Sequence, residues 1–467
     1  MTELAKISDS VQYYPHQIEG VREMSRMSSF LLADEMGLGK SLQALTVAAV
    51  DFEAGLAKRV IIVCPATLKW NWQAEIEEHT KFVAMVLDGT PKKREAQLAG
   101  FDLEHLDVLI VNYEQVEPHL AALNALDFDI AIFDEAHYIK SRRAKRTKAA
   151  QALRAKRRFL LTGSPLLNQI DELWSLLYRI DPEGFPSYHR FVNRYAVFGG
   201  YKDKQVVGIK NARELNSRLQ SLMIRREKSK VLDLPEKQHI RVMLELSPEQ
   251  AKLYRQARDD LRIDIPSSLD PMEIENALTK MLRLKQIIGT TATITDQDHS
   301  SKLDHAEELV EDVVNSGEHI VVFTQFREVL ACLERRLVAR GVPVFTMTGD
   351  TPTNKRVDLV NEWSASKPAA LVAMLQVASV GLNMTKASKC VFLDKLWTPK
   401  LNEQAEDRLH RIGADGTKPI QIFELVCRGT IEARIEAILK SKRELFGTVV
   451  EESEWKRRLI ETLADDE

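Results

Sequence analysis

Short apolar runs recur along the chain, and each is followed by a stretch whose apolar residues repeat with helical spacing. We predict that these runs are strands, and in the first half they cover residues 30–33, 60–64, 84–87, 108–112, 130–134 and 159–162. In the second half they cover residues 240–246, 320–324, 344–347, 370–375, 390–393 and 420–426. Strands that are apolar on both faces and separated by helices predict mostly parallel sheets covered by helices, so the fold class is α/β.

The two series of strands predict two lobes of roughly 200 residues each. Pro235 follows Leu232-Asp233-Leu234 and cannot continue a helix, so we predict a first lobe over 1–234 and a second over 235–467. The first lobe carries a mostly helical insertion over about 175–231, with a hairpin expected near 199–210. The second lobe carries a helical insertion over about 247–300 and C-terminal helices over about 430–467.

The composition is that of a soluble globular protein, with 44% apolar residues, 28% charged residues and a net charge of −3. A nearly neutral chain can contact nucleic acid only through local basic patches. The four cysteines show no paired spacing, which predicts buried free thiols in a reducing compartment. No apolar run approaches ~18 residues and the start does not resemble a signal peptide. We therefore expect a monomer of the cytosol, or of the nucleus in a eukaryote, without a membrane partner.

A glycine-containing turn joins the first predicted strand to a helical pattern that begins at Lys40. Such a turn before a helix N-terminus forms an anion site, because backbone N–H groups point outward and the helix dipole favours negative charge. Gly37 and Gly39 let the backbone approach phosphate oxygens. Lys40 would reach the β- and γ-phosphates, and Ser41 would bind Mg²⁺. Asp34 stands where the usual phosphate-loop pattern has glycine, so a simple strand-to-helix turn is the alternative.

The sequence Asp134-Glu135-Ala136-His137 lies at the carboxyl end of a predicted strand, where open α/β sheets bind their ligands. Asp134 suits the binding of Mg²⁺, and Glu135 suits the orientation and deprotonation of an attacking water. An acidic helix N-cap is the alternative. Together with the Lys40 loop upstream, the pattern favours catalysis.

Two further stretches carry candidate nucleotide contacts. Gln17 precedes the Lys40 loop, and its amide can donate and accept hydrogen bonds as the adenine edge requires. An ordinary helix-surface glutamine is the alternative. The helical pattern over 404–413 places Arg408 and Arg411 three positions apart and hence on one face. Two guanidinium groups there would neutralise charge on the γ-phosphate, whereas a surface helix with charge pairs is the alternative.

These motifs occur in one order along the chain. They are Asp-Glu-Met-Gly-Leu-Gly-Lys-Ser at 34–41, Asp-Glu-Ala-His at 134–137, Leu-Thr-Gly-Ser-Pro-Leu-Leu-Asn at 161–168 and the arginine stretch. In that order they resemble the ATPase motor of the Swi/Snf family of superfamily-two, DEAH-box helicase-like proteins, which also has aspartate at the position of Asp34. Phe-Thr-Gln-Phe at 323–326 and Gly-Leu-Asn at 381–383 are similar to the family as well. The resemblance covers nearly the whole chain.

The resemblance implies two RecA-like lobes that bind ATP and Mg²⁺ in a DNA-dependent ATPase. It assigns catalysis to six residues, namely Lys40, Asp134, Glu135, Gln404, Arg408 and Arg411. It assigns nucleotide binding to Gln17, Gly37, Gly39, Lys40, Ser41 and Gly381, and metal binding to Ser41 and Asp134.

Residues 140–158 contain ten Lys or Arg residues and no Asp or Glu. A solvated basic helix is the alternative to a binding site. The run directly follows the DEAH strand, on the edge where the family grips DNA, which favours phosphate contacts. The candidate contacts are Lys140, Arg142, Arg143, Lys145 and Arg146, with residues 92–94 and 225–228 as further candidates. No base-reading motif is visible, so we expect sequence-independent contacts to the backbone of double-stranded DNA.

Together these features predict a DNA-stimulated ATPase that translocates on double-stranded DNA, with hydrolysis coupled to lobe closure, in DNA remodelling, repair or replication. A strand-separating DNA or RNA helicase is one alternative. A nucleotide-gated DNA-binding scaffold with negligible turnover is another. Four residues argue against it, namely Lys40, Glu135, Arg408 and Arg411.

Overall fold

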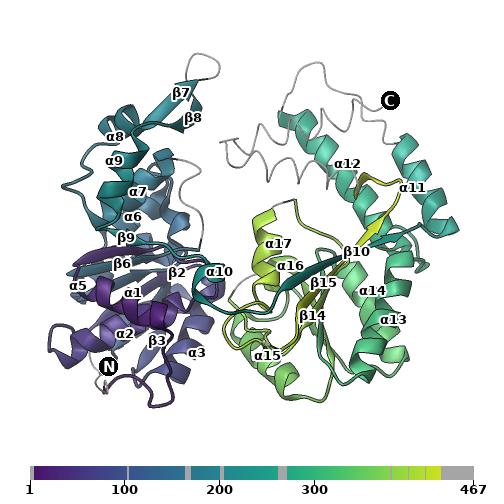
Figure 1. Ribbon diagram of the computed structural model, residues 1–467, viewed down its shortest axis with the longest axis horizontal. Coiled ribbons are helices and arrows are strands. Elements are labelled where there is room, and N and C mark those ends of the chain that lie inside the picture. The colour runs from purple at the N-terminus through teal and green to yellow at the C-terminus, as the bar shows by residue number, and fades with distance from the viewer. Residues whose placement is uncertain are drawn as a thin grey trace. The chain divides into compact units, whose positions relative to one another are not determined.

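The computed structural model describes residues 5–101, 105–163, 170–199, 205–260, 271–378, 381–397, 399–415 and 417–432. The chain divides into two compact units, Met1–Asp233 and Leu234–Glu467, and each is built on its own parallel sheet (Figure 1). Residues 164–168 of the third predicted motif and the predicted helices beyond residue 432 lie outside the described residues.

The first unit contains a sheet of seven described strands in the order β3-β4-β2-β5-β6-β1-β9, and every neighbouring pair is parallel. In chain order its strands are β1 (Ser29–Leu32), β2 (Val60–Cys64), β3 (Ala84–Val86), β4 (Val108–Asn112), β5 (Ile130–Phe133), β6 (Arg157–Leu161) and β9 (Met223–Ile224). An antiparallel hairpin, β7 (Ala196–Gly199) and β8 (Gln205–Ile209), stands apart from this sheet.

Helices cover both faces of the first sheet. The described helices of this unit are α1 (Pro15–Ser25), α2 (Lys40–Glu53), α3 (Lys69–His79), α4 (Pro91–Gly100), α5 (Tyr113–Ala125), α6 (Lys145–Ala152), α7 (Ile170–Ile180), α8 (Tyr188–Tyr195), α9 (Ala212–Leu219) and α10 (Lys228–Val231), with short 3₁₀ turns η1 (Ala66–Leu68) and η2 (Ala136–Ile139). Apolar residues of α5, α6 and α7 pack on one face, and Figure 1 shows α1 and α2 on the opposite side of the strands from α6 and α7. Strands β1, β2 and β5 are buried along their whole length, as their continuous apolar sequences require.

The second unit contains a sheet of six described strands in the order β10-β15-β14-β11-β13-β12, again parallel throughout. In chain order the strands are β10 (Lys237–Leu244), β11 (Ile320–Thr324), β12 (Val344–Met347), β13 (Ala370–Met374), β14 (Lys389–Phe392) and β15 (Ile420–Cys427). Side chains alternate between two apolar cores, so that Val321 and Phe323 enter one and Ile320 and Val322 enter the other.

One of these cores is completed by α15 (Arg356–Ala365), α16 (Leu375–Ala378) and α17 (Pro399–Glu406), and the other by α13 (Ser301–Asn315) and α14 (Arg327–Ala339). The remaining helices are α11 (Pro248–Asp260), α12 (Pro271–Gly289) and the 3₁₀ turns η5 (Thr291–Thr293) and η6 (Thr353–Lys355). Together α11 and α12 form the helical insertion that follows β10, and they pack against each other.

The twelve predicted strands are all present, and four of them match the structure to the residue, namely β2, β4, β11 and β12. The predicted hairpin is confirmed as β7 and β8, and the α/β fold class is confirmed in both units. The sequence did not predict β9, because two residues are too few to show a periodicity. All four cysteines are buried free thiols, as predicted.

Candidate nucleotide site

Three neighbouring strands of the first unit bring the predicted site residues to one edge. Strand β6 lies between β1 and β5, with Leu32 paired to Leu161 and Phe133 paired to Leu160. The residues that follow these three parallel strands therefore meet at the carboxyl edge of the sheet, where open α/β sheets bind ligands. They are the Lys40 loop after β1, the Asp134-Glu135 pair after β5, and Thr162-Gly163 after β6.

The loop between β1 and α2 has the backbone that a phosphate requires. Gly37 and Gly39 adopt left-handed conformations with φ of 82° and 72°, which side-chain-bearing residues rarely adopt. Gly39 is the N-cap of α2, and Lys40 and Ser41 form the first turn of that helix. A side chain at Gly39 would also collide with the amide of Gln17, since an added Cβ would lie 2.2 Å from its Nε2. The left-handed backbone thus favours glycine at this position, and any side chain there would also displace the Gln17 amide.

The Lys40 ammonium lies over the loop and beside Gly163. Its Nζ donates to the carbonyl oxygens of Asp34 at 2.9 Å and Glu35 at 3.0 Å. A Cβ added at Gly163 would lie 3.4 Å from the same Nζ and 2.5 Å from Cγ of Met36. The absence of a side chain at Gly163 leaves room for the ammonium at the junction of β1 and β6.

Asp34 stands where the usual phosphate-loop pattern has glycine, and its carboxylate binds an arginine. Arg226, between β9 and α10, donates to it from Nε at 2.9 Å and from Nη2 at 2.5 Å, and the Arg226 backbone N–H adds a third bond at 3.0 Å. The guanidinium also donates to the carbonyl of His16 and, at 2.9 Å, to Oε1 of Gln43. The Arg226 side chain is 9% exposed, so its grouping with the candidate DNA contacts at 225–228 is wrong.

Gln17 lies on the first turn of α1 and points at the phosphate loop. Its Oε1 accepts the backbone N–H of Tyr14 at 3.0 Å, and its Nε2 donates to the carbonyl of Leu38 at 3.5 Å. The ring Nε2 of His16 is 3.1 Å from the same carbonyl, and burial lowers the pKa of His16. The sequence therefore located a residue beside the loop, and its contact with adenine stays a prediction.

Asp134 is held by three groups at the end of β5. One carboxylate oxygen accepts the indole N–H of Trp72 at 2.9 Å and the other accepts the backbone N–H of Glu135 at 2.8 Å. The Tyr113 hydroxyl donates to the Asp134 carbonyl at 2.7 Å. Burial raises the pKa of Asp134 to about 6, and the adjacent Glu135 carboxylate adds to the rise. The contact of Trp72 with Asp134 could not be predicted from the sequence, because no local pattern reveals a partner 62 positions away.

Glu135 has a left-handed backbone with φ of 48°, which is uncommon for a residue other than glycine. Its Oε2 forms an ion pair with Nδ1 of His137 at 3.0 Å. Strained backbone conformations concentrate at functional sites, because the surrounding structure has to hold them in place. The strained backbone of Glu135 and its contact with His137 therefore agree with a functional role for the Glu135 carboxylate.

The residues present fit ATP and Mg²⁺. The hydroxyl of Ser41 and the carboxylate of Asp134 are oxygen ligands of the kind that Mg²⁺ prefers. A buried carboxylate with a raised pKa, as at Asp134, is stabilised in its ionised form by a nearby cation. The left-handed glycines and the start of α2 present backbone N–H groups of the kind that bind phosphate.

In the second unit the predicted arginine helix is shorter than the sequence indicates. Helix α17 ends at Glu406, and Arg408 and Arg411 lie in the turns that follow it, so the prediction that they share a helical face is wrong. The backbone tightens here, since the N–H of Arg408 bonds to the carbonyl of Ala405, three positions back. Tertiary contacts explain the change, because Leu409 is fully buried in a core of the unit.

Other contacts fix the turns after α17. Lys237 of β10 pairs with Glu406 at 3.3 Å and with Asp407 at 3.0 Å. His410 lies 2.9 Å, through its ring Nε2, from the carbonyl of Pro235. Gln404 lies within α17, and Gly381 has a left-handed φ of 71°. No observation here tests the assigned roles of Gln404 and Gly381, which stay predictions.

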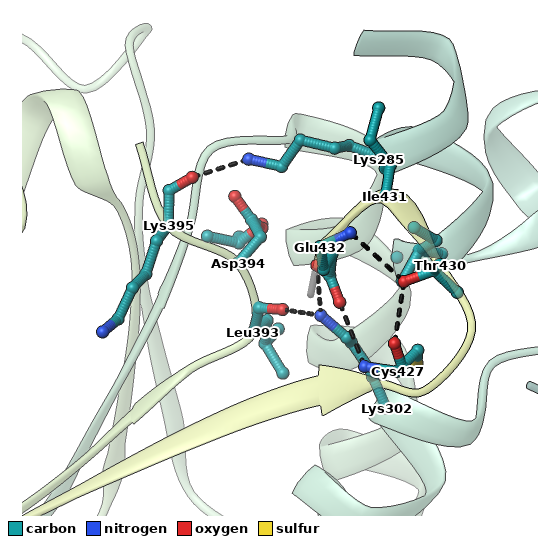
Figure 2. Close-up of polar contacts among 12 residues, drawn as sticks. Lys285, Lys302, Leu393, Asp394, Lys395, Cys427, Thr430, Ile431 and Glu432 are labelled. Atoms are coloured by element: carbon teal, nitrogen blue, oxygen red, sulfur yellow. Dashed lines mark hydrogen bonds and ion pairs between the residues drawn. The ribbon is translucent and has the colours of Figure 1, made fainter. Parts of the chain in front are cut away.

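A buried charged cluster holds the segment that leads to α17. Figure 2 shows Lys285 and Lys302 pointing at the backbone on either side of Asp394, where they donate to the carbonyls of Lys395 at 2.6 Å and Leu393 at 2.5 Å. Lys302 also pairs with Glu432 at 2.7 Å. Burial lowers the pKa of Lys285. For Lys302, burial also acts to lower the pKa, but the combined attraction of Glu432, Cys427 and Asp394 exceeds this effect and raises the pKa.

The basic run over 140–158 separates into two parts. In its last part Lys156 pairs with Asp129 at 2.6 Å, and Arg157 pairs with buried Asp51. These two cations take part in ion pairs within the first unit, which neither the DNA-contact prediction nor the alternative of a solvated helix describes.

In the first part of the run, two guanidinium groups stack on tyrosine rings. Arg142 lies 4.2 Å from the ring centroid of Tyr188, and Arg146 lies 5.4 Å from that of Tyr138. Lys140, Arg143 and Lys145 are exposed on the same stretch. The five predicted contacts to DNA therefore lie together, and their role stays a prediction.

Comparison with known families decides the relationship. The SNF2-related domain matches residues 16–292, which is more than half of the chain, and the helicase conserved C-terminal domain matches residues 301–413. The chain belongs to the SNF2-related family of helicase-like ATPases. The predicted resemblance is thereby confirmed, and the two α/β units are the RecA-like lobes of this family.

Individual relatives match over nearly the whole chain. YwqA of Bacillus subtilis, provisionally named an ATP-dependent helicase/translocase, is 28% identical over 434 residues, covering 91% of this chain and 47% of YwqA. The DNA annealing helicase and endonuclease ZRANB3 of Mus musculus is 29% identical over 456 residues, covering 93% of this chain and 40% of its own length. The chain thus spans less than half the length of these relatives.

Among solved structures, the SWI2/SNF2 ATPase core of Sulfolobus solfataricus in complex with double-stranded DNA is 26% identical, with a TM-score of 0.46. That comparison covers 98% of this chain and 96% of the archaeal chain. Within the described residues, no helix of this SNF2-related protein is both long and apolar enough to cross a membrane.

Proposed function

We propose that this SNF2-related protein is an ATPase that is stimulated by double-stranded DNA and translocates along it. The observation that carries the proposal is the convergence of the Lys40 loop, Gly163 and the Asp134-Glu135 pair at the ends of three neighbouring strands. Family membership supplies the reaction class, and the basic stretch beside the site supplies a surface for a polyanion.

In the proposed reaction Lys40 exchanges the carbonyls of Asp34 and Glu35 for phosphate oxygens. Ser41 and Asp134 would hold Mg²⁺, which when bound neutralises phosphate charge and orients the reacting groups. Glu135 accepts the proton of the attacking water.

The second lobe contributes positive charge in this proposal. Arg408 and Arg411 neutralise the charge that develops on the γ-phosphate during transfer. The buried backbone contacts around them supply the rigid support that such groups need, as the Met384 N–H donates to the Arg408 carbonyl at 3.0 Å.

The proposed DNA contacts are Lys140, Arg142, Arg143, Lys145 and Arg146. The tyrosine rings under Arg142 and Arg146 restrict these side chains, so their contact with phosphate costs less conformational entropy than that of free arginines. The mouse relative is named for an activity on DNA, which agrees with this assignment. Contacts to the backbone carry no sequence information, so binding is expected to be independent of sequence.

Substitution within the basic run tests the interface. Replacing Arg143 and Lys145 by alanine is expected to weaken duplex binding at every sequence, and to reduce the slope of log affinity against log salt by about one unit per contact. Lys156→Ala is the matched control, because Lys156 is in the same run but pairs with Asp129. Equal losses for Lys156→Ala and for the double variant would contradict the interface.

Triplex displacement tests translocation. Wild type with ATP is expected to remove a third strand from duplex DNA without opening the duplex, and Lys40→Ala is expected to remove none. Separation of forked strands would favour the helicase alternative. Tight DNA binding with neither displacement nor turnover would favour the scaffold.

A further inference from the structure

The last segment of the first lobe pairs along the phosphate loop. The N–H of Ala33 donates to the carbonyl of Ile224 at 2.8 Å, and the N–H of Glu35 donates to the carbonyl of Arg226 at 3.0 Å. In return, the N–H of Lys228 donates to Oε2 of Glu35 at 2.8 Å. The loop is thus one strand of a local ladder whose other strand is the segment from Ile224 to Lys228.

Side chains reinforce this ladder at its centre. The bidentate pair between Arg226 and the fully buried Asp34 excludes water, which strengthens charge-assisted hydrogen bonds. Gln43 extends the network, because its Oε1 accepts from Arg226 at 2.9 Å while its Nε2 donates to the carbonyls of Leu38 at 3.3 Å and Gly39 at 3.4 Å. Arg226 therefore contacts the first part of the loop directly, through Asp34. It reaches the turn at Gly39 indirectly, through Gln43.

We infer that Arg226 is a positioning residue for nucleotide binding, which it serves by fixing the phosphate loop through Asp34 and Gln43. The inference rests on the proposed binding of ATP by this loop. Arg226 lies eight positions before Leu234, at which the second unit begins. The segment that fixes the phosphate loop therefore belongs to the last part of the first unit.

The direct test is the affinity for a fluorescent ADP analogue. Arg226→Lys keeps the charge but loses the planar fork, so it cannot make both bonds to Asp34. The dissociation constant is expected to rise ~10-fold or more, the scale of a lost hydrogen bond to a charged group. All measurements are made well below the unfolding temperature of each variant.

Arg157 offers a matched control in the same unit. It also pairs with a buried carboxylate, Asp51, and donates to the carbonyls of Met24 at 2.8 Å and Met27 at 2.7 Å. Met24 and Met27 lie at or just beyond the C-terminal end of α1, and Asp51 lies near the C-terminal end of α2, the end away from the phosphate loop. Arg157→Lys is expected to lower the unfolding temperature while leaving the dissociation constant within about two-fold of wild type, a change of about 0.4 kcal/mol or less.

A second variant leaves the arginine in place. A Cβ added at Gly20 would lie 1.9 Å from Oε1 of Gln43 and 2.8 Å from Nη2 of Arg226, so Gly20→Ala pushes both side chains away. It is expected to weaken nucleotide binding in the same direction as Arg226→Lys. In a double-mutant cycle that combines Arg226→Lys with Asp34→Asn, the losses of nucleotide affinity are expected to be non-additive, since each substitution breaks the same ion pair.

Three results would overturn the inference. They are unchanged affinity in folded Arg226→Lys, equal losses for Arg226→Lys and Arg157→Lys, or additive losses in the cycle with Asp34→Asn. Failure of the wild-type protein to bind any adenine nucleotide would instead overturn the proposed function, so the two failures are distinguishable.

Discussion

Each lobe buries a charged cluster beside a segment that carries predicted site residues. The two clusters differ in how far along the chain they lie from those residues. In the first lobe Asp34 stands in the loop that bears Lys40, and Arg226 pairs with it there. In the second lobe Lys285 and Lys302 hold the backbone around Asp394, and Arg408 follows only after α17. The first cluster can therefore set nucleotide affinity, whereas the second contributes mainly to the stability of its lobe.

The difference shows that burial of charge near a site does not by itself define a role. Asp394 accepts hydrogen bonds from the Thr324 hydroxyl at 2.5 Å and from Nε2 of Gln325 at 2.6 Å, so it joins two strand ends of its sheet. Asp394 thus accepts several hydrogen bonds, as Asp34 does. The two clusters differ in their distance along the chain from a predicted catalytic residue. Asp34 shares a short loop with Lys40, whereas α17 separates Asp394 from Arg408.

Loss of the arginines should give the largest effect and would define what the second lobe contributes. Arg408→Ala or Arg411→Ala is expected to lower turnover ~10³–10⁵-fold at saturating ATP while changing nucleotide affinity little, because such groups act on transition-state charge. Steady-state hydrolysis and analogue binding measure the two quantities. Arg428→Ala is the control, since Arg428 is 62% exposed on the same lobe. An equal loss of nucleotide affinity and turnover would contradict the view that the first lobe sets affinity and the second lobe contributes to catalysis.

Glu135→Gln should give the next largest effect. The amide keeps the shape of the side chain but cannot accept the proton, so turnover is expected to fall ~10²–10⁴-fold. Nucleotide binding should persist, because the Lys40 loop is intact. Single-turnover hydrolysis with bound ATP measures the step, and near-normal turnover would remove Glu135 from the proposed mechanism.

The strands and the loop were predictable from the sequence because both depend on local patterns. Continuous apolar runs located the strands, and glycines before Lys40 located a left-handed turn that the structure confirms. Polar partners far apart in the chain were not predictable. The pair of Asp34 and Arg226 spans 192 positions, and Arg226 was one cation among several until its burial was known.

The end of α17 shows a second kind of failure. The sequence continues with helical spacing to Gly413, but the helix ends at Glu406 because burial of Leu409 and the ion pairs of Lys237 favour tighter turns. Tertiary contacts of this kind override local propensity. The helical face on which the sequence grouped Arg408 with Arg411 is absent, and their catalytic assignment, which the family resemblance also implies, stays a prediction.

Lys302→Met tests the structural role of the second cluster. Removing the ammonium leaves Glu432 buried without its cation, so the free energy of unfolding is expected to fall by about 3–5 kcal/mol. Chemical denaturation measures the loss, and the double variant with Glu432→Gln should recover part of it. Nucleotide affinity of the folded variant should equal that of wild type, and a ~10-fold loss of affinity would assign this cluster to the site after all.

A surface carboxylate gives the smallest expected effect and sets the lower end of the scale. Ion pairs with Lys389 and Lys418 lower the pKa of Glu318 from 4.5 to about 2. A lowered pKa in the folded state stabilises the protein at neutral pH, and this stabilisation is lost as the pH falls from about 5 toward 2. Glu318→Gln should cost about 1 kcal/mol or less at pH 7, because solvent screens exposed pairs. The gap between the unfolding free energies of wild type and variant should narrow at pH 4, and a constant gap would contradict the assignment.

The most direct test of the central claim is steady-state ATP hydrolysis by wild type and Lys40→Ala, alone and with duplex DNA, single-stranded DNA or RNA. We predict strong stimulation of wild type by duplex DNA, weaker stimulation by the other two nucleic acids, and no turnover by Lys40→Ala. Turnover that RNA or single strands stimulate best would contradict a duplex translocase. Absence of turnover under every condition, despite measurable binding of ATP, would contradict the motor itself.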